Sequence, residues 1–241
     1  MKKILVCLTS LALTVLCGCS KTDGTPITKE FSIGNTYTEL NVSHAFNVTV
    51  SDEVTQVTVT AGDRIMPKVI VEEKNGKLII RLKNLTVANG TLTALIPYNF
   101  NLKEVDLSGA SEFHSQHPIA APSVSIDLSG ASKFYGEVEA TTKLDLDLSG
   151  ASDATLTGTV GTLDIDLSGA SNIKQTTAGN RYGLSCNNCQ GDMSGASTAY
   201  IHCDGTIAVD LSGSSTLHYT GNASTSGCSL SGSSNVIHEV L

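Results

Sequence analysis

Apolar and polar residues alternate in a short phrase that recurs through the second half of the chain. The phrase DLSGAS spans Asp106 to Ser111 and returns at Asp127 and Asp166, with close relatives at Asp147, Asp192, Asp210 and Ser229. Apolar residues stand two and four positions before nearly every glycine of the phrase, separated by Asp or Ser. This period-two alternation predicts a strand with one buried face.

A second apolar column stands four residues after each glycine, where the chain has Phe113, Phe134, Ala154, Ile173, Ala199, Leu217 and Val236. The phrase therefore predicts a strand, a sharp corner and a second strand. Glycine suits the corner because it adopts positive φ without steric cost. The predicted corner positions are Asp106, Asp127, Asp147, Asp166, Asp192, Asp210, Gly109, Gly130, Gly150, Gly169, Gly195, Gly213 and Gly232.

The glycines follow one another at steps of 21, 20, 19, 26, 18 and 19 residues. A period near twenty with one buried face per strand predicts an all-β, right-handed parallel β-helix, a solenoid with roughly 19–21 residues per repeat. Leucine-rich repeats have similar periods, but their Leu-x-x-Leu-x-Leu spacing is missing here. The long step predicts a loop within Ala178 to Gln190, where Gly, Asn and Arg gather.

Residues 29–101 contain shorter β-rich runs. Asn75-Gly76 lies between two alternating stretches and predicts a β-hairpin. The letters HAF at His44 resemble a degenerate corner. We therefore expect one domain over residues 29–241, in which residues 29–101 continue the repeats of residues 102–241 and cap their end. A separate small β domain is the alternative.

The first residues have the features of an export signal. Met1-Lys2-Lys3 is basic, Ile4 to Leu16 is apolar, and Leu16-Cys17-Gly18-Cys19 resembles a lipobox. We expect residues 1–18 to be a lipoprotein signal peptide, Cys19 to carry the lipid that binds the membrane, and residues 19–28 to form a tether. An ordinary secretory signal or an uncleaved anchor is the alternative, although the run is shorter than the ~20 apolar residues that a membrane span needs.

Charge is unevenly distributed along the chain. The whole chain has a formal charge of −8, and residues 101–241 contain fifteen Asp and Glu against five Lys and Arg. This balance argues against nucleic acid as a partner.

A family resemblance covers nearly the whole mature chain, from about Phe31 to the C-terminus. The stretch FSIGNTYTELNVSHAFNVTVS, followed by LTALIPYNFNLKEVDLSGAS and the repeated DLSGAS, resembles the head GIN domain of putative auto-transporter adhesins. The resemblance implies a right-handed β-helix of pectin-lyase-like shape, a role in cell adhesion, and no known catalytic residues. The chain departs from the pattern at GDMSGAS with its long repeat, and at Ser229, which replaces the aspartate.

The aspartate of each phrase invites three interpretations. Closely spaced carboxylates are typical of retaining glycosidases, and rows of carboxylates can hold Ca²⁺. An active site should depart from the repeat, however, and one aspartate per repeat supplies few of the oxygens that Ca²⁺ needs. We expect each aspartate to accept hydrogen bonds at its own corner, with no metal and no cofactor.

Four cysteines lie beyond the leader, at positions 186, 189, 203 and 228. Cys186, Cys189, His202 and Cys203 have a spacing loosely like that of a zinc site, but buried thiols, or a disulfide involving Cys186 or Cys203, are favoured. The remaining histidines share no common spacing, so no Ser-His-Asp arrangement is indicated.

Together these features predict a non-enzymatic lipoprotein of the cell envelope, on the surface or periplasmic side of the outer membrane. Its polar face would bind an unknown glycan or protein ligand as an adhesin. A polysaccharide-active enzyme and a purely structural envelope component are the alternatives.

Overall fold

The computed structural model describes residues 23–84, 88, 90–178 and 181–241. The predicted leader, Cys19 and the first part of the tether lie outside the described residues. No helix in the described part is long and apolar enough to cross a membrane. The fold is all-β, with a single 3-10 turn at Met66–Lys68.

Twenty strands make up the fold. Eighteen belong to one mixed sheet, and β14 and β15 pair by themselves. The strands are β1 (Pro26–Phe31), β2 (Glu39–Val42), β3 (Phe46–Ser51), β4 (Val57–Gly62), β5 (Val69–Lys74), β6 (Lys77–Leu82), β7 (Leu92–Pro97), β8 (Glu104–Leu107), β9 (Glu112–His114), β10 (Ile119–Leu128), β11 (Lys133–Leu148), β12 (Asp153–Leu167), β13 (Asn172–Ile173), β14 (Thr177–Ala178), β15 (Arg181–Tyr182), β16 (Leu184–Met193), β17 (Thr198–Leu211), β18 (Thr216–Thr220), β19 (Ser229–Leu230) and β20 (Asn235–His238).

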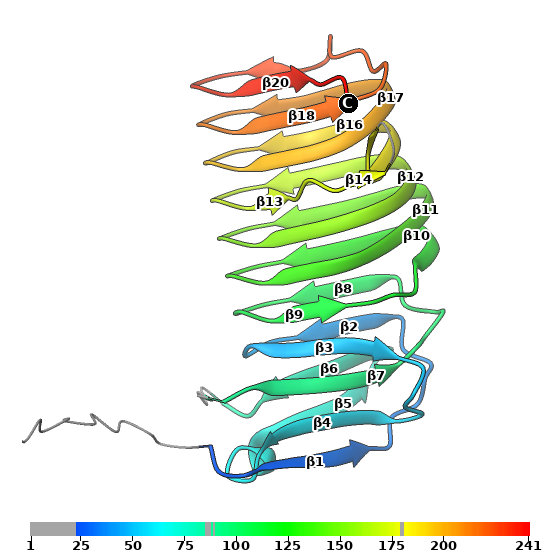
Figure 1. Ribbon diagram of the computed structural model, residues 1–241, viewed down its shortest axis with the longest axis vertical. Helices are drawn as coiled ribbons and strands as arrows, with labels where there is room; N and C mark the ends of the chain where they lie inside the picture. Colours follow the sequence, from blue (N-terminus) through cyan, green and yellow to red (C-terminus); the bar gives the residue numbers. More distant parts are fainter. Residues whose placement is uncertain (1–22, 85–87, 89, 179–180) are drawn as a thin grey trace, which may run out of the picture.

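Successive repeats lie over one another in parallel register (Figure 1). Asp106 pairs with Asp127, Asp127 with Asp147, and the same column continues to Asp210. In the strands that follow the first two corners, Phe113 of β9 pairs with Phe134 of β11 in the same way. Each backbone therefore finds its hydrogen-bond partners in the repeats above and below it, as the repeated phrase predicts.

The two apolar columns form the core. The leucines two positions before the glycines are at most 2% exposed from Leu107 to Leu211, and Met193 takes the same place in the long repeat. Phe113 and Phe134 are fully buried and stack with ring centroids 5.1 Å apart. Burial of each such side chain contributes roughly 1.5–3 kcal/mol, so the stacked columns supply much of the driving force for folding.

The N-terminal strands join the same sheet. β2 pairs with β8 and β3 with β9, both parallel, whereas β1–β4, β4–β7 and β5–β6 are antiparallel. His44 and Ala45 have φ of 70° and 63° and turn the chain between β2 and β3, which confirms the degenerate corner. Asn75 and Gly76, with φ of 54° and 77°, form the predicted hairpin between β5 and β6.

The extra residues of the long repeat begin earlier in the chain than the predicted loop does. Residues 184–193 form the regular strand β16, in which Cys186 and Cys189 are buried and pair with Val160 and Leu163 of β12. The extra residues instead lie before Leu184, where β14 and β15 form a small hairpin. The predicted range is therefore right for Ala178 to Gly183 and wrong from Leu184 on, where the inward alternation of the strand is carried by cysteines rather than by aliphatic residues.

Candidate functional site

The corner glycines approach the preceding repeat very closely. From Gly109 to Gly232 they have φ of 70° to 76°. A Cβ atom built on Gly150 would lie 2.5 Å from the carbonyl oxygen of Gly130. Only glycine combines the left-handed conformation with so short a distance between two backbones, so these positions serve architecture rather than ligand binding.

The corner hydrogen bonds differ from the predicted ones. The second serine of the phrase, not the aspartate, supplies them: Ser152 Oγ donates to the carbonyl of Ser149 over 2.9 Å, and Ser111, Ser132, Ser215 and Ser234 do the same at their corners. Asp106 accepts a hydrogen bond from Asn41, on the neighbouring strand β2. No amide or serine of the described chain donates to the carboxylates of the other five. The serine is fully buried and close to the carbonyl, whereas the aspartate points outward.

The aspartates form an acidic ladder, which we define as Asp106, Asp127, Asp147, Asp166, Asp192 and Asp210. Partial burial and the neighbouring carboxylates of Asp147 and Asp106 raise the pKa of Asp127. Partial burial and Asp166 raise the pKa of Asp147. These shifts show that the stacked carboxylates destabilise one another.

Two aspartates beside the ladder, Asp145 and Asp164, are instead paired with a lysine. Lys143 Nζ lies 2.5 Å from Asp145 and 2.9 Å from Asp164. No three His, Cys, Asp or Glu side chains of the described residues are arranged to hold a metal ion.

A hollow surface lies along the strands that follow the first corners. We call it the outer groove; its volume is about 870 Å³. One row of paired residues forms its floor: Thr49 on β3, His114 on β9, Tyr135 on β11 and Thr155 on β12. The rings of His114 and Tyr135 stack with centroids 4.5 Å apart and planes 7° apart, so the floor is rigid.

Two turns form the walls of the outer groove. One contains Asp52 and Glu53, and the other contains Gln116 and His117. His117 Nε2 lies 2.8 Å from Asp52 Oδ2, and the His117 ring stacks on Tyr98 at 4.3 Å. These contacts fix the imidazole beside the floor.

The lining of the outer groove is rich in hydrogen-bonding groups. Carboxylates come from Asp52, Glu53 and Glu137, and hydroxyls from Ser51, Tyr135, Thr155 and Thr157, among others. Neither Lys nor Arg lines the groove. Such a surface favours neutral or cationic ligands that carry hydroxyl or amino groups, and opposes polyanions.

The sequence did not predict the outer groove. Asp52 and His117 are 65 residues apart, and only the pairing of β3 with β9 brings their turns together. One signal was present: the fifth residue after the glycine is outward-facing and aromatic in several repeats, as His114, Tyr135, Tyr200 and His218 show, and the last two also stack.

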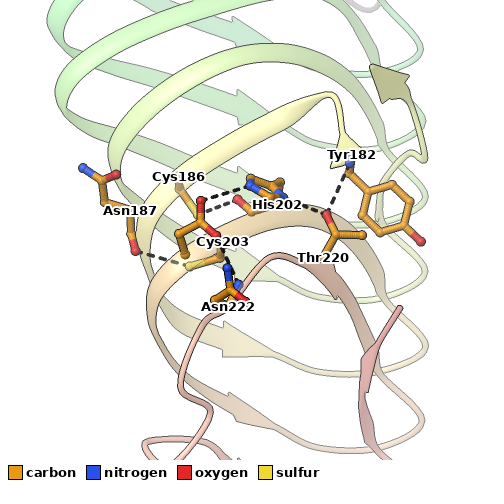
Figure 2. A network of polar contacts seen from close by, with 8 residues as sticks. Tyr182, Cys186, Asn187, His202, Cys203, Thr220 and Asn222 are labelled. Carbon is orange, nitrogen blue, oxygen red and sulfur yellow. Dashed lines mark hydrogen bonds and ion pairs between the residues drawn. The ribbon is translucent and has the colours of Figure 1, made fainter. Parts of the chain in front are cut away.

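Cys186, Cys203 and His202 belong to a separate polar network (Figure 2). Cys186 and Cys203 pair in register on β16 and β17, and all four described cysteines are free thiols. Cys186, Cys189 and Cys203 are buried, as predicted, and Cys228 is half-buried. Contact with the Cys203 thiol, together with burial, raises the pKa of Cys186 and so disfavours the thiolate.

His202 does not serve these thiols. Its ring contacts Thr220 at 2.9 Å and Asp204 at 3.1 Å, outside the core, whereas the Cys203 thiol donates to the Asn187 carbonyl (Figure 2). His202 and Cys203 are consecutive residues of β17, so their side chains point to opposite faces of the strand. Among the described residues the network therefore has no thiol–imidazole contact, and the Cys186 thiol donates to the backbone carbonyl of His202 instead.

Comparison with known proteins places residues 36–223 within one family model, described as putative auto-transporter adhesin, head GIN domain. No curated protein matches the sequence. Among solved structures, a putative adhesin from Bacteroides fragilis is similar over 89% of this chain and 97% of its own, with a TM-score of 0.71 and 17% identity. A putative adhesin from Parabacteroides merdae covers 90% and 97%, with a TM-score of 0.68 and 19% identity.

A third structure, a putative lipid binding protein from Parabacteroides distasonis, covers 89% and 94%, with a TM-score of 0.61 and 19% identity. At these identities the three likenesses show a shared fold.

Proposed function

Because this chain belongs to the family of putative auto-transporter adhesins with the head GIN domain, we propose that it is an interaction module of the cell envelope that binds its ligand in the outer groove. The observation that carries this proposal is the rigid row of His114 and Tyr135 between two polar turns. A concave site with preformed polar groups is the usual form of a ligand site.

The lining favours a neutral, hydroxyl-rich glycan as the ligand. Carboxylates accept hydrogen bonds from sugar hydroxyls, and imidazole and threonine side chains both donate and accept them. The apolar parts of Tyr135 offer contact area for the sugar ring. A protein ligand is the alternative, and many shallow contacts along the strands would then supply the affinity.

The handedness of the fold and the location of the protein are part of the same proposal. The parallel register between repeats and the general handedness of parallel crossovers support a right-handed β-helix. The basic, apolar and Cys-Gly-Cys segments of residues 1–19 support export and attachment to the outer membrane through a lipid on Cys19.

A glycan array tests this function directly. A form of the mature protein that lacks Cys19, residues 20–241, retains every described residue and should bind a subset of neutral glycans saturably and without EDTA sensitivity. Tyr135→Ala should weaken binding about tenfold, since it removes both ring contacts and a hydroxyl. Asp166→Asn, which changes the acidic ladder outside the groove, serves as the control and should bind normally.

Three outcomes would contradict the proposal. Released sugars would reveal a polysaccharide-active enzyme. Equal binding by the Tyr135 and Asp166 variants would place the ligand on another face, and the absence of any glycan or matrix-protein ligand would favour a purely structural envelope component.

A further inference from the structure

A second, smaller cavity lies behind one wall of the outer groove. Val50, Ser115 and His117 line both spaces, so the cavity and the groove adjoin. The remaining walls of the cavity are mostly apolar and belong to the core, with Ile96 and Phe113 among them. The free volume is about 10 Å³, which is room for one group the size of a methyl or a water molecule.

One polar group of this cavity has no partner. Tyr37 lines the cavity and is 1% exposed, and its hydroxyl forms no hydrogen bond within the described part of the chain. A buried hydroxyl without a partner lowers the stability of the fold, because it has lost its hydrogen bonds to water. Burial raises the pKa of Tyr37 to about 12, so the hydroxyl keeps its proton and remains a donor. The folded chain thus leaves one donor here for an external acceptor.

The side chains of Asn99 and Ser115, which also line the cavity, are engaged elsewhere. Asn99 Nδ2 donates to the Tyr37 carbonyl over 2.6 Å, and Asn99 Oδ1 accepts from the Asn101 amide over 2.9 Å. Ser115 Oγ donates to the His117 carbonyl over 2.7 Å. A water molecule beside the Tyr37 hydroxyl would therefore meet mainly apolar walls, whereas buried water typically has about three polar partners.

We propose that this cavity receives the acetyl group of an N-acetylated glycan bound in the outer groove, an inference that rests on the proposed function. An acetyl group combines one methyl with one carbonyl oxygen. The methyl fills the apolar space, and the carbonyl oxygen accepts the hydrogen bond that the Tyr37 hydroxyl does not make within the chain. The amide N–H then lies on the groove side, where the Asp52 carboxylate can accept it.

The size of the cavity limits what it can receive. A free volume of about 10 Å³ excludes an acyl chain and a second sugar ring. The rings of Tyr98 and His117 both line the cavity and stack with centroids 4.3 Å apart. His117 Nε2 lies 2.8 Å from Asp52 Oδ2, which holds this pair of rings in place. The cavity is therefore selective for a single small substituent.

An array of glycan pairs tests the inference on the form that lacks Cys19. The members of each pair share their linkages and differ only in carrying an N-acetyl group or a hydroxyl at one position. The wild type should bind the N-acetylated members roughly tenfold more tightly. Tyr37→Phe removes the hydroxyl and keeps the ring, so it should abolish most of this preference and leave the affinity for the hydroxyl members unchanged.

Urea denaturation shows whether Tyr37→Phe acts through the fold. Because the hydroxyl has no partner in the free protein, the free energy of unfolding should stay the same or rise. Tyr219→Phe is the matched control. Tyr219 is also buried, but it lies on β18, outside both the cavity and the groove, and this variant should bind every pair as the wild type does.

The outcomes separate this inference from the proposed function. Equal binding of both members of each pair by the wild type would overturn the inference and leave the proposed function standing. An unchanged preference in Tyr37→Phe would do the same. Binding of no glycan at all would overturn both.

Discussion

At the residue scale, each corner depends on two small side chains with different tasks. The glycine permits the left-handed turn against the neighbouring backbone, and the buried serine ties the turn together through a carbonyl three residues earlier. Each corner therefore combines small residues with one buried hydroxyl, whereas the aspartate points outward and contributes charge.

The serines allow a matched test of this bond. Ser152→Ala removes a buried hydroxyl that bonds the Ser149 carbonyl at 2.9 Å, and should lower the free energy of unfolding by about 1 kcal/mol. Ser197, at the same place of another repeat, is equally buried, but its Oγ has no hydrogen-bond partner. Ser197→Ala should therefore be neutral or stabilising. Urea denaturation measures both, and equal losses would contradict the assignment.

At the scale of strands, the sequence predicted the buried columns, which recur with the period of the repeat, and missed the features that depend on which strands pair. Leu107 and Phe113 revealed the buried faces because the same offsets from glycine recur in every repeat. The roles of serine and aspartate were exchanged, since both residue types form turns and only coordinates show which one points inward. Asp52 and His117 could not be related, because no local pattern specifies which strands pair.

The acidic ladder gives the protein a pH dependence of defined sign. Because the pKa of Asp127 is raised, the folded state takes up this proton more readily than the unfolded state. The fold therefore gains stability as pH falls through the raised pKa toward the ordinary aspartate value of 3.8, and ionisation costs stability at higher pH. Asp127→Asn should increase the free energy of unfolding at pH 7, and this gain should shrink as pH falls through the raised pKa and vanish well below pH 3.8.

Asp164 should change the stability of the protein with pH in the opposite direction. Partial burial opposes its ionisation, but hydrogen bonds from Lys143 and Gln190 outweigh this and lower its pKa. Asp164→Asn should therefore destabilise the protein at pH 7, with a loss that shrinks as pH falls through the lowered pKa of this group. Chemical denaturation at several pH values measures both variants; slopes of the same sign would refute the ladder argument.

At the scale of the whole molecule, each repeat is held only by its neighbours, so local stability should differ from repeat to repeat with the burial of its side chains. Cys228 lies just before the corner of Gly232 and is half-buried, whereas Cys189, on β16 two repeats earlier, is buried and burial raises its pKa. In dilute protein, a thiol reagent should modify Cys228 many times faster than Cys189, which should react only on global unfolding.

Mass spectrometry of proteolytic peptides follows each thiol separately. Cys228→Ser should remove the fast phase and leave the slow ones unchanged. Modification of both thiols at one rate would mean that the stack opens as a single unit.

The column of corner glycines also divides the molecule into an invariant side and an adaptable one. The corner glycines stack equally closely after repeats of 18 and of 26 residues, because the backbones of successive repeats are in direct contact there. Differences in length are absorbed elsewhere, as the hairpin of β14 and β15 shows by leaving β12 and β16 in register. New surface features can accordingly arise on the adaptable side during evolution without any change in how the protein folds.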